Sequence, residues 1–131
     1  LNADMIARNA PDSAAILGML PPHKNSTELV EMALAANQAV AGFALDTLWD
    51  QPSHPEGFYF RSDHAPYAQA RIPALFYTSL LHADYHTARD ESQTLDYAKL
   101  LRFTRWMYAT GWSVAEADQA PRIDEGWQYR R

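Results

Sequence analysis

Short apolar runs alternate with helical segments along this 131-residue chain, and this alternation limits the possible folds more than any other feature. Short apolar runs predict buried strands, and apolar residues at helical spacing predict helices that cover a sheet. The expected strands are residues 1–7, 14–20, 43–49 and 74–78. Strands separated by helices predict an α/β fold, with helices on both faces of the sheet.

The first expected helix begins at Ser26 or Thr27, either of which can cap it, and ends at Gly42. A short helix is expected over residues 65–70, and a long helix, capped by Thr94, over residues 95–117. The apolar spacing of the long helix predicts a buried stripe, with Lys99, Arg102 and Glu116 on the opposite face. The expected stripe comprises Tyr97, Leu100, Leu101, Thr104, Met107, Tyr108, Gly111, Val114 and Ala115.

The composition excludes several classes of protein. A length of 131 residues allows at most one domain, and 47% hydrophobic residues are enough for a core. The net charge of −5, from 11 basic and 16 acidic side chains, argues against a nucleic-acid surface. The absence of cysteine excludes disulfides and thiolate metal sites. No apolar stretch approaches the roughly 20 residues that a membrane span needs.

Side chains typical of metal sites lie at the ends of the expected strands. Asp4 ends the first apolar run, residues 62–64 (SDH) lie in a loop, and residues 84–86 (DYH) follow the strand 74–78. Aspartate and histidine are ordinary zinc ligands. Because loops after strand ends gather at one edge of an α/β sheet, these residues are compatible with one shared site.

Four motifs in the same order resemble metallopeptidase family twenty-eight, the zinc aminopeptidase and glutamate carboxypeptidase group. Residues 2–8 (NADMIAR) resemble its N-x-D-M-I-G-R stretch, and residues 62–67 (SDHAPY) its S-D-H-x-P-F segment. Residues 72–76 (IPALF) resemble its G-I-P-A-L-F strand, and residues 84–90 (DYHTARD) its D-Y-H-x-x-x-D loop. The similarity extends from residue 1 to about residue 115. The chain departs from the family pattern at Ala7, Arg71 and Ala88, where Gly, Gly and Pro are common.

The resemblance implies a partial mixed sheet flanked by helices, as in the zinc-exopeptidase (phosphorylase/hydrolase-like) fold, without its N-terminal half. Residues 1–117 would form the C-terminal segment of the catalytic domain, and residues 118–131 a charged and aromatic tail. The chain begins without Met inside an expected strand, so we expect it to be a segment of a longer protein. Family members are often exported, which favours a periplasmic or secreted location with the leader upstream.

The family holds two zinc ions with two His, two Asp and one Glu. Carried over by motif, Asp4 would bind one ion and His86 the other. The remaining ligands and the Glu that acts as general base would lie upstream, in the missing N-terminal half. That half and a peptide substrate are therefore the expected partners. A homodimer of the fragment is left open.

The resemblance also implies roles for residues beside the ligands. Tyr85 would donate a hydrogen bond to the oxyanion of the tetrahedral intermediate. Ser62 is expected to donate to the carboxylate of Asp4 and fix its orientation. Asp63 and Asp90 are expected to orient neighbouring loops or to cap helices.

The other histidines are expected to have structural roles or none. His64 is expected to make structural hydrogen bonds rather than to bind a metal. The remaining three, His23, His54 and His82, are expected to be exposed loop residues.

The expected activity is that of a zinc-dependent aminopeptidase, which hydrolyses N-terminal peptide bonds with a metal-activated water. With two of the five ligands present, the isolated fragment is expected to bind zinc weakly, if at all, and to be inactive. A glutaminyl-cyclase-like aminoacyltransferase on the same fold is an alternative. A further alternative is a receptor or interaction module that has lost catalysis.

Overall fold

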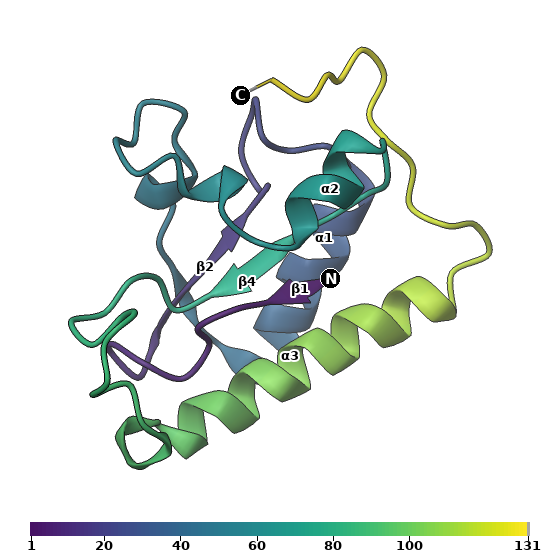
Figure 1. Cartoon of the computed structure of the whole chain (residues 1–131). Helices are drawn as coiled ribbons and strands as arrows, with labels where there is room; N and C mark the ends of the chain where they lie inside the picture. The colour runs from purple at the N-terminus through teal and green to yellow at the C-terminus, as the bar shows by residue number, and fades with distance from the viewer. Residues whose placement is uncertain (131) are drawn as a thin grey trace.

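A four-stranded mixed sheet organises the computed structural model, which describes residues 1–130 (Figure 1). Its strands are β1 (Asn2–Ala3), β2 (Ser13–Leu17), β3 (Ala44–Leu45) and β4 (Phe76–Thr78). The strand order is β1-β4-β2-β3, in which β4 is parallel to β1 and antiparallel to β2, and β3 is parallel to β2. The predicted α/β class and mixed sheet are confirmed.

All four strands are shorter than the sequence pattern predicted, and in the first two the backbone turns before the apolar run ends. The first run, predicted over residues 1–7, leaves the sheet at Met5, whose φ is +56°. The second, predicted over residues 14–20, ends at Gly18, whose φ is +92°. Apolar residues beyond these turns still pack on the core, so hydrophobicity alone does not reveal where pairing stops.

Three α-helices accompany the sheet, namely α1 (Thr27–Ala36), α2 (His64–Gln69) and α3 (Tyr97–Ala115). The Ser26 hydroxyl caps α1 by accepting a hydrogen bond from the amide of Leu29 at 3.2 Å. A π-helical turn (Asn37–Ala41) follows α1 and ends at Gly42, as predicted, with φ +67°. Short 3₁₀ turns occupy Leu48–Asp50, Phe58–Phe60 and Ser92–Thr94. No helix within residues 1–130 has the length and hydropathy required to cross a bilayer.

The predicted buried stripe of the long helix is only partly right, because Met107 and Val114 pack against the core but the fully buried side chains lie elsewhere. The side chains of α3 that are buried are Lys99, Phe103, Trp106 and Thr110. Predicted stripe residues such as Tyr97 and Tyr108 are instead 61% and 68% exposed. The burial of Lys99 explains the error, because its ammonium group donates to the main-chain carbonyls of Arg8 at 2.6 Å and Ala10 at 2.8 Å. A cation with such partners tolerates burial, and the sequence does not show them. The cap of α3 is Asp96 rather than Thr94.

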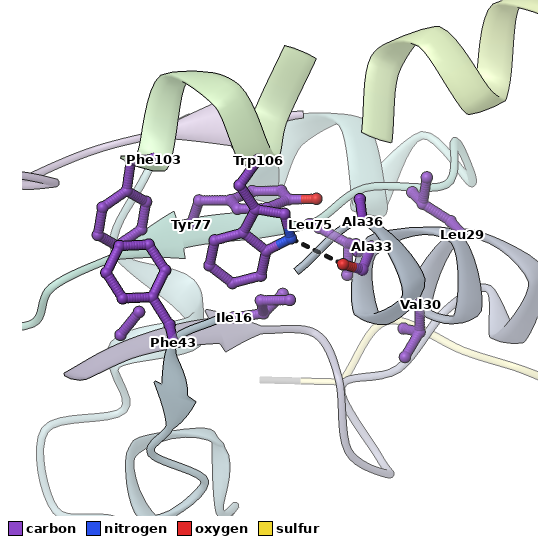
Figure 2. Close-up of a cluster of buried hydrophobic side chains, with 11 residues drawn as sticks. Ile16, Leu29, Val30, Ala33, Ala36, Phe43, Leu75, Tyr77, Phe103 and Trp106 are labelled. Carbon is purple, nitrogen blue, oxygen red and sulfur yellow. Dashed lines mark hydrogen bonds between the residues drawn. The ribbon is translucent and has the colours of Figure 1, made fainter. Parts of the chain in front are cut away.

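The main hydrophobic core lies between one face of the sheet and helices α1 and α3 (Figure 2). Ile16 of β2 pairs with Tyr77 of β4 on this face, and Trp106 of α3 packs edge-on against Tyr77. The indole nitrogen of Trp106 donates to the carbonyl of Ala33 in α1 at 2.7 Å, so the largest core side chain also satisfies its polar atom.

A second cluster covers the opposite face of the sheet. Leu17 and Phe76, which pair across β2 and β4, pack there with Phe58, Tyr59 and Leu80. Strands β2 and β4 are therefore buried on both faces. This rigid centre holds the shorter β1 at its edge.

A buried carboxylate organises the loop after β2. The carboxylate oxygens of Asp50 accept hydrogen bonds from the amides of Gly18, Met19 and Leu20 at 3.0, 2.8 and 2.7 Å. Nδ1 of His23 lies 3.0 Å from Oδ1 of the same carboxylate, and His23 is only 5% exposed. The prediction that His23 is an exposed loop residue is therefore wrong, because Asp50 supplies a buried partner from another segment.

The C-terminal residues described by the structure pack across the start of α1. The carboxylate of Asp124 accepts hydrogen bonds from the amide and hydroxyl of Thr27, both at 2.8 Å. The guanidinium of Arg122 pairs with the carboxylate of Glu28 at 2.5 Å. These contacts attach the tail to the first turn of α1.

The two tryptophans of α3 provide a test of this packing. Trp106→Ala is expected to lower the free energy of unfolding by about 3–5 kcal/mol, because it empties a buried site and removes the bond to Ala33. Trp112→Ala, on the same helix but 56% exposed, is expected to change it by less than about 0.5 kcal/mol. Urea unfolding followed by circular dichroism measures both, and equal losses would contradict the observed orientation of α3.

Candidate functional site

Asp4 lies where β1 ends, at the edge of the sheet from which β4 also leaves. Its amide donates to the carbonyl of Tyr77 at 3.1 Å, which continues the parallel pairing of the two strands. Its Oδ2 accepts a hydrogen bond from the hydroxyl of Ser62 at 2.8 Å, and Oγ of Ser62 accepts one from the side-chain amide of Asn2 at 2.7 Å. Two side chains in series thus orient the Asp4 carboxylate.

The loops that follow the parallel strands β1 and β4 leave the same end of the sheet (Figure 1), and hydrogen bonds join them. The amide and hydroxyl of Ser79 donate to the carbonyl of Met5 at 2.8 and 2.5 Å. The side-chain amide of Asn9 donates to the carbonyls of Ser79 at 2.6 Å and Leu81 at 2.9 Å. These contacts hold the segment that follows Asp4 against the segment that precedes residues 84–86.

Backbone strain is concentrated in the same two loops. Met5, Asn9, Leu80 and His86 all have positive φ angles, of +56°, +63°, +69° and +56°. A positive φ is uncommon for residues other than glycine, and it persists where the surrounding structure enforces it. Residues held in this way often belong to functional sites, which agrees with the position of these loops beside Asp4.

Arg8 connects the first loop to the acidic residues of the second. Its guanidinium forms an ion pair with Asp84 and donates to Oδ1 of Asp90 at 2.7 Å and to the hydroxyl of Thr94 at 2.7 Å. Arg89 donates to the other oxygen of Asp84 at 3.1 Å. The hydrogen bonds from Arg8, and then those from Arg89, hold the pKa of the Asp84 carboxyl below its usual value.

Tyr85 and His86 follow Asp84 directly. Their rings stack with centroids 3.8 Å apart and an angle of 20° between the planes. The His86 side chain is exposed, whereas Tyr85 is partly buried. An exposed imidazole and a carboxylate oriented by Ser62 have the chemistry of zinc ligands.

The described part of the chain does not complete a metal site by itself. Within residues 1–130, no group of three or more His, Asp or Glu side chains is arranged to hold a metal ion. Zinc sites in proteins use three or four protein ligands. Asp4 and His86 therefore fit zinc as donors but need ligands from other residues.

The other two predicted acidic residues have different surroundings. Asp63 is exposed and precedes α2, but its side chain forms no capping hydrogen bond with that helix. Asp90 pairs with Arg8, and its second oxygen lies 3.7 Å from Nε2 of His82.

Two of the predictions for histidines near this site are wrong. His64 is 2% exposed, and within residues 1–130 neither ring nitrogen has a hydrogen-bond partner. It stacks on Phe76 instead, with ring centroids 5.1 Å apart. Desolvation by burial lowers the pKa of His64 from 6.5 to about 4, despite an opposing effect of the Tyr59 backbone. His82, predicted to be exposed, has a side chain that is only 4% exposed, and its Nε2 lies 3.7 Å from Oδ2 of Asp90. His54 is partly buried, since it stacks on Trp49.

Two residues of the site were not singled out from the sequence. Asn2 supports Ser62, and Arg8 pairs with two aspartates 76 and 82 positions later. Both lie in residues 2–8, the first motif, and this membership was the one sequence signal that could have identified them as site residues. Their partners lie in other motifs, and only folding shows which residues meet.

Asp4 and residues 84–86 follow the parallel strands β1 and β4 of a mixed sheet, an arrangement consistent with a segment of a peptidase domain. The model of Peptidase family M28 matches residues 1–111, and the chain belongs to that family. The predicted family is thereby confirmed. The matched range contains all the predicted site residues. No curated protein and no solved structure gives a significant match.

The buried His64 predicts loss of stability in acid. Between pH 6.5 and about 4 the unfolded chain binds a proton on this imidazole that the folded chain excludes. The neutral ring is retained above pH 6.5, so the free energy of unfolding is expected to fall by about 1–3 kcal/mol as pH decreases through this window.

His64→Phe keeps an aromatic ring on Phe76 and removes the titrating group. Urea unfolding of both proteins at pH 7, 6, 5 and 4 is expected to show a smaller loss in the variant. An identical pH dependence in the two proteins would contradict the assignment to His64.

Proposed function

We propose that this chain supplies one ligand to each of two zinc ions, and an oxyanion donor, in a zinc-dependent aminopeptidase. Asp4 binds one ion and His86 the other. The main support is the Asp4 carboxylate, which accepts a hydrogen bond from Ser62, together with the ion pair of Arg8 with Asp84, directly before Tyr85 and His86, in a chain of Peptidase family M28. Bound zinc lowers the pKa of a coordinated water and polarises the scissile carbonyl of the peptide.

Ser62 keeps the Asp4 carboxylate in one orientation. Its hydroxyl donates to Oδ2 at 2.8 Å, so Oδ1 is the oxygen that would bind the ion. Asn2 restrains the hydroxyl in turn, which reduces the rotation that a lone serine retains. Such supporting hydrogen bonds typically change metal affinity or activity by about 10–100-fold.

Tyr85 donates a hydrogen bond from its phenolic hydroxyl to the oxygen that becomes negative when water attacks the scissile carbonyl. A donor held in position before the reaction stabilises that charge at little cost in reorganisation. Stacking on His86 at 3.8 Å supports this role, because it limits the motion of both rings. Asp63 and Asp90 are proposed to orient neighbouring loops, Asp90 through its bond to Arg8.

The other half of the metal centre comes from residues outside this chain. They provide the second His, the bridging Asp, the Glu ligand and the Glu that acts as general base. The chain alone is therefore expected to bind zinc weakly and to hydrolyse no peptide. The substrate of the complete domain is a peptide with a free N-terminal residue.

Zinc titration tests the ligand assignment. The 131-residue chain is expected to lack tight zinc binding by calorimetry, whereas the domain with its upstream ligands is expected to hold two ions. In that domain, Asp4→Asn and His86→Gln should each reduce the zinc content and lower hydrolysis of an aminoacyl p-nitroanilide by at least about 10³-fold, since metal activation of water is lost. Asp118→Asn and His54→Gln are matched controls and should change neither quantity. Full zinc content and activity in Asp4→Asn would refute the proposal.

Tyr85→Phe tests the oxyanion role separately. It removes one hydroxyl from a side chain that is not a ligand, so zinc content should stay constant while kcat falls by about 10²–10³-fold. Cyclisation of a peptide with N-terminal Gln, without hydrolysis of the anilide, would instead support the transferase alternative.

A further inference from the structure

We propose that Arg8 is a positioning residue, which keeps the loop of Tyr85 and His86 in a fixed position relative to Asp4. This inference rests on the proposed function, because it concerns the geometry of those three residues. Arg8 contacts Asp84, directly before Tyr85, and Asp90, four positions after His86. Asp84 and Asp90 thus lie on either side of Tyr85 and His86 in the chain, and the single guanidinium of Arg8 binds both carboxylates.

The backbone of Arg8 is itself fixed at three points. Its amide donates to the hydroxyl of Ser79 at 3.2 Å, and its carbonyl accepts from the buried ammonium group of Lys99 at 2.6 Å. The preceding carbonyl, of Ala7, accepts from the amide of Asp96 at 2.9 Å. The guanidinium therefore extends from a backbone tied to the residue that follows β4 and to the start of α3, four positions after Asp4.

The burial and shape of Arg8 suit this role. Its side chain is 12% exposed, whereas Asp84 and Asp90 are 21% and 38% exposed, so solvent screens the pair with Asp84 less than the pair with Asp90. One terminal nitrogen binds Asp84 and the other binds both Asp90 and Thr94. Lysine carries a single point charge on a flexible stem and cannot present two separated nitrogens in a plane.

The backbone conformation of the loop explains why contacts from Arg8 are needed. His86 has φ +56°, a backbone conformation that is unfavourable for a residue with a side chain. Such a conformation persists only where contacts enforce it. Without Arg8, Asp84 and Asp90 lose a shared cation, and the strained backbone between them loses its restraint. The expected result is a loop that samples other conformations and moves the imidazole away from Asp4.

The first test is made on the 131-residue chain, without metal. Arg8→Met is expected to speed amide hydrogen exchange in residues 82–91 by at least about tenfold and to shift the imidazole resonances of His86. Exchange in the core of α1 and α3 should change much less. Arg122→Met is the matched control, because Arg122 also pairs with a carboxylate, on Glu28, at another place on the chain. Unchanged loop exchange and His86 resonances in Arg8→Met would overturn the inference.

Arg8→Lys and Asp84→Asn keep the test valid if Arg8→Met fails to fold. Lysine should restore only part of the loop protection, since it retains the charge but not the two-nitrogen geometry. Asp84→Asn removes the contact from the loop and should loosen residues 82–91 in the same way. If residues 82–91 exchange their amide hydrogens as slowly in both variants as in the wild type, Arg8 does not position this loop.

The second test is made on the domain with its upstream ligands. Arg8→Lys is expected to lower kcat by about 10–100-fold with little change in KM, because the reacting geometry is altered more than peptide binding. Equal kcat in variant and wild type would overturn the positioning role. If the wild-type domain neither binds zinc nor hydrolyses peptides, the proposed function fails, whereas the exchange results still decide whether Arg8 orders the loop.

Discussion

The parallel pairing of β1 with β4 is the interaction on which the rest of the site depends. Asn2 and Ala3 align with Phe76 and Tyr77, and the pairing continues through the hydrogen bond from the Asp4 amide to Tyr77. Parallel strands send their following loops to the same edge of the sheet. This short pairing therefore brings together two segments about 80 positions apart in the chain. It remains in place because β4 is buried on both faces by the two hydrophobic clusters.

Charged side chains then fix the conformation of the loops that follow the strands. The Asp50 carboxylate accepts hydrogen bonds from three consecutive amides after β2, and the Lys99 ammonium donates to two carbonyls of the loop after β1. Arg8 extends from that second loop to the aspartates around His86. In each case a charged side chain from a distant segment satisfies several groups that would otherwise be costly to bury. The irregular segments of this chain are thus as dependent on long-range contacts as its sheet.

Sequence reasoning succeeded where a local pattern carries the information. The cap at Ser26, the stop at Gly42 and the short helix α2 all follow from neighbouring residues. It failed where the choice depends on a distant partner. The buried face of α3 is the clearest case, because apolar residues at helical spacing fit more than one rotation of that helix, and Lys99 is buried by carbonyls some 90 positions earlier.

The histidines show the same division. A loop position suggested exposure for His23 and His82, but their side chains are only 6% and 4% exposed and lie beside Asp50 and Asp90. His64 was expected to find hydrogen bonds, yet its ring is packed among aromatic side chains that offer none. Histidine is compatible with all of these environments. Its surroundings are a property of the fold rather than of the neighbouring residues.

The order of four motifs along the chain determined the family, because each motif consists of adjacent residues that can be read without a structure. The alternation of apolar runs and helical segments likewise determined the α/β class. Tertiary structure alone decided the hydrogen bond of Ser62 to Asp4, the bridge of Arg8 to Asp84 and Asp90, and the rotation of α3. The physical reason is that periodicity and motifs are local, whereas a hydrogen bond or an ion pair depends on which distant side chains folding brings within about 3 Å of each other.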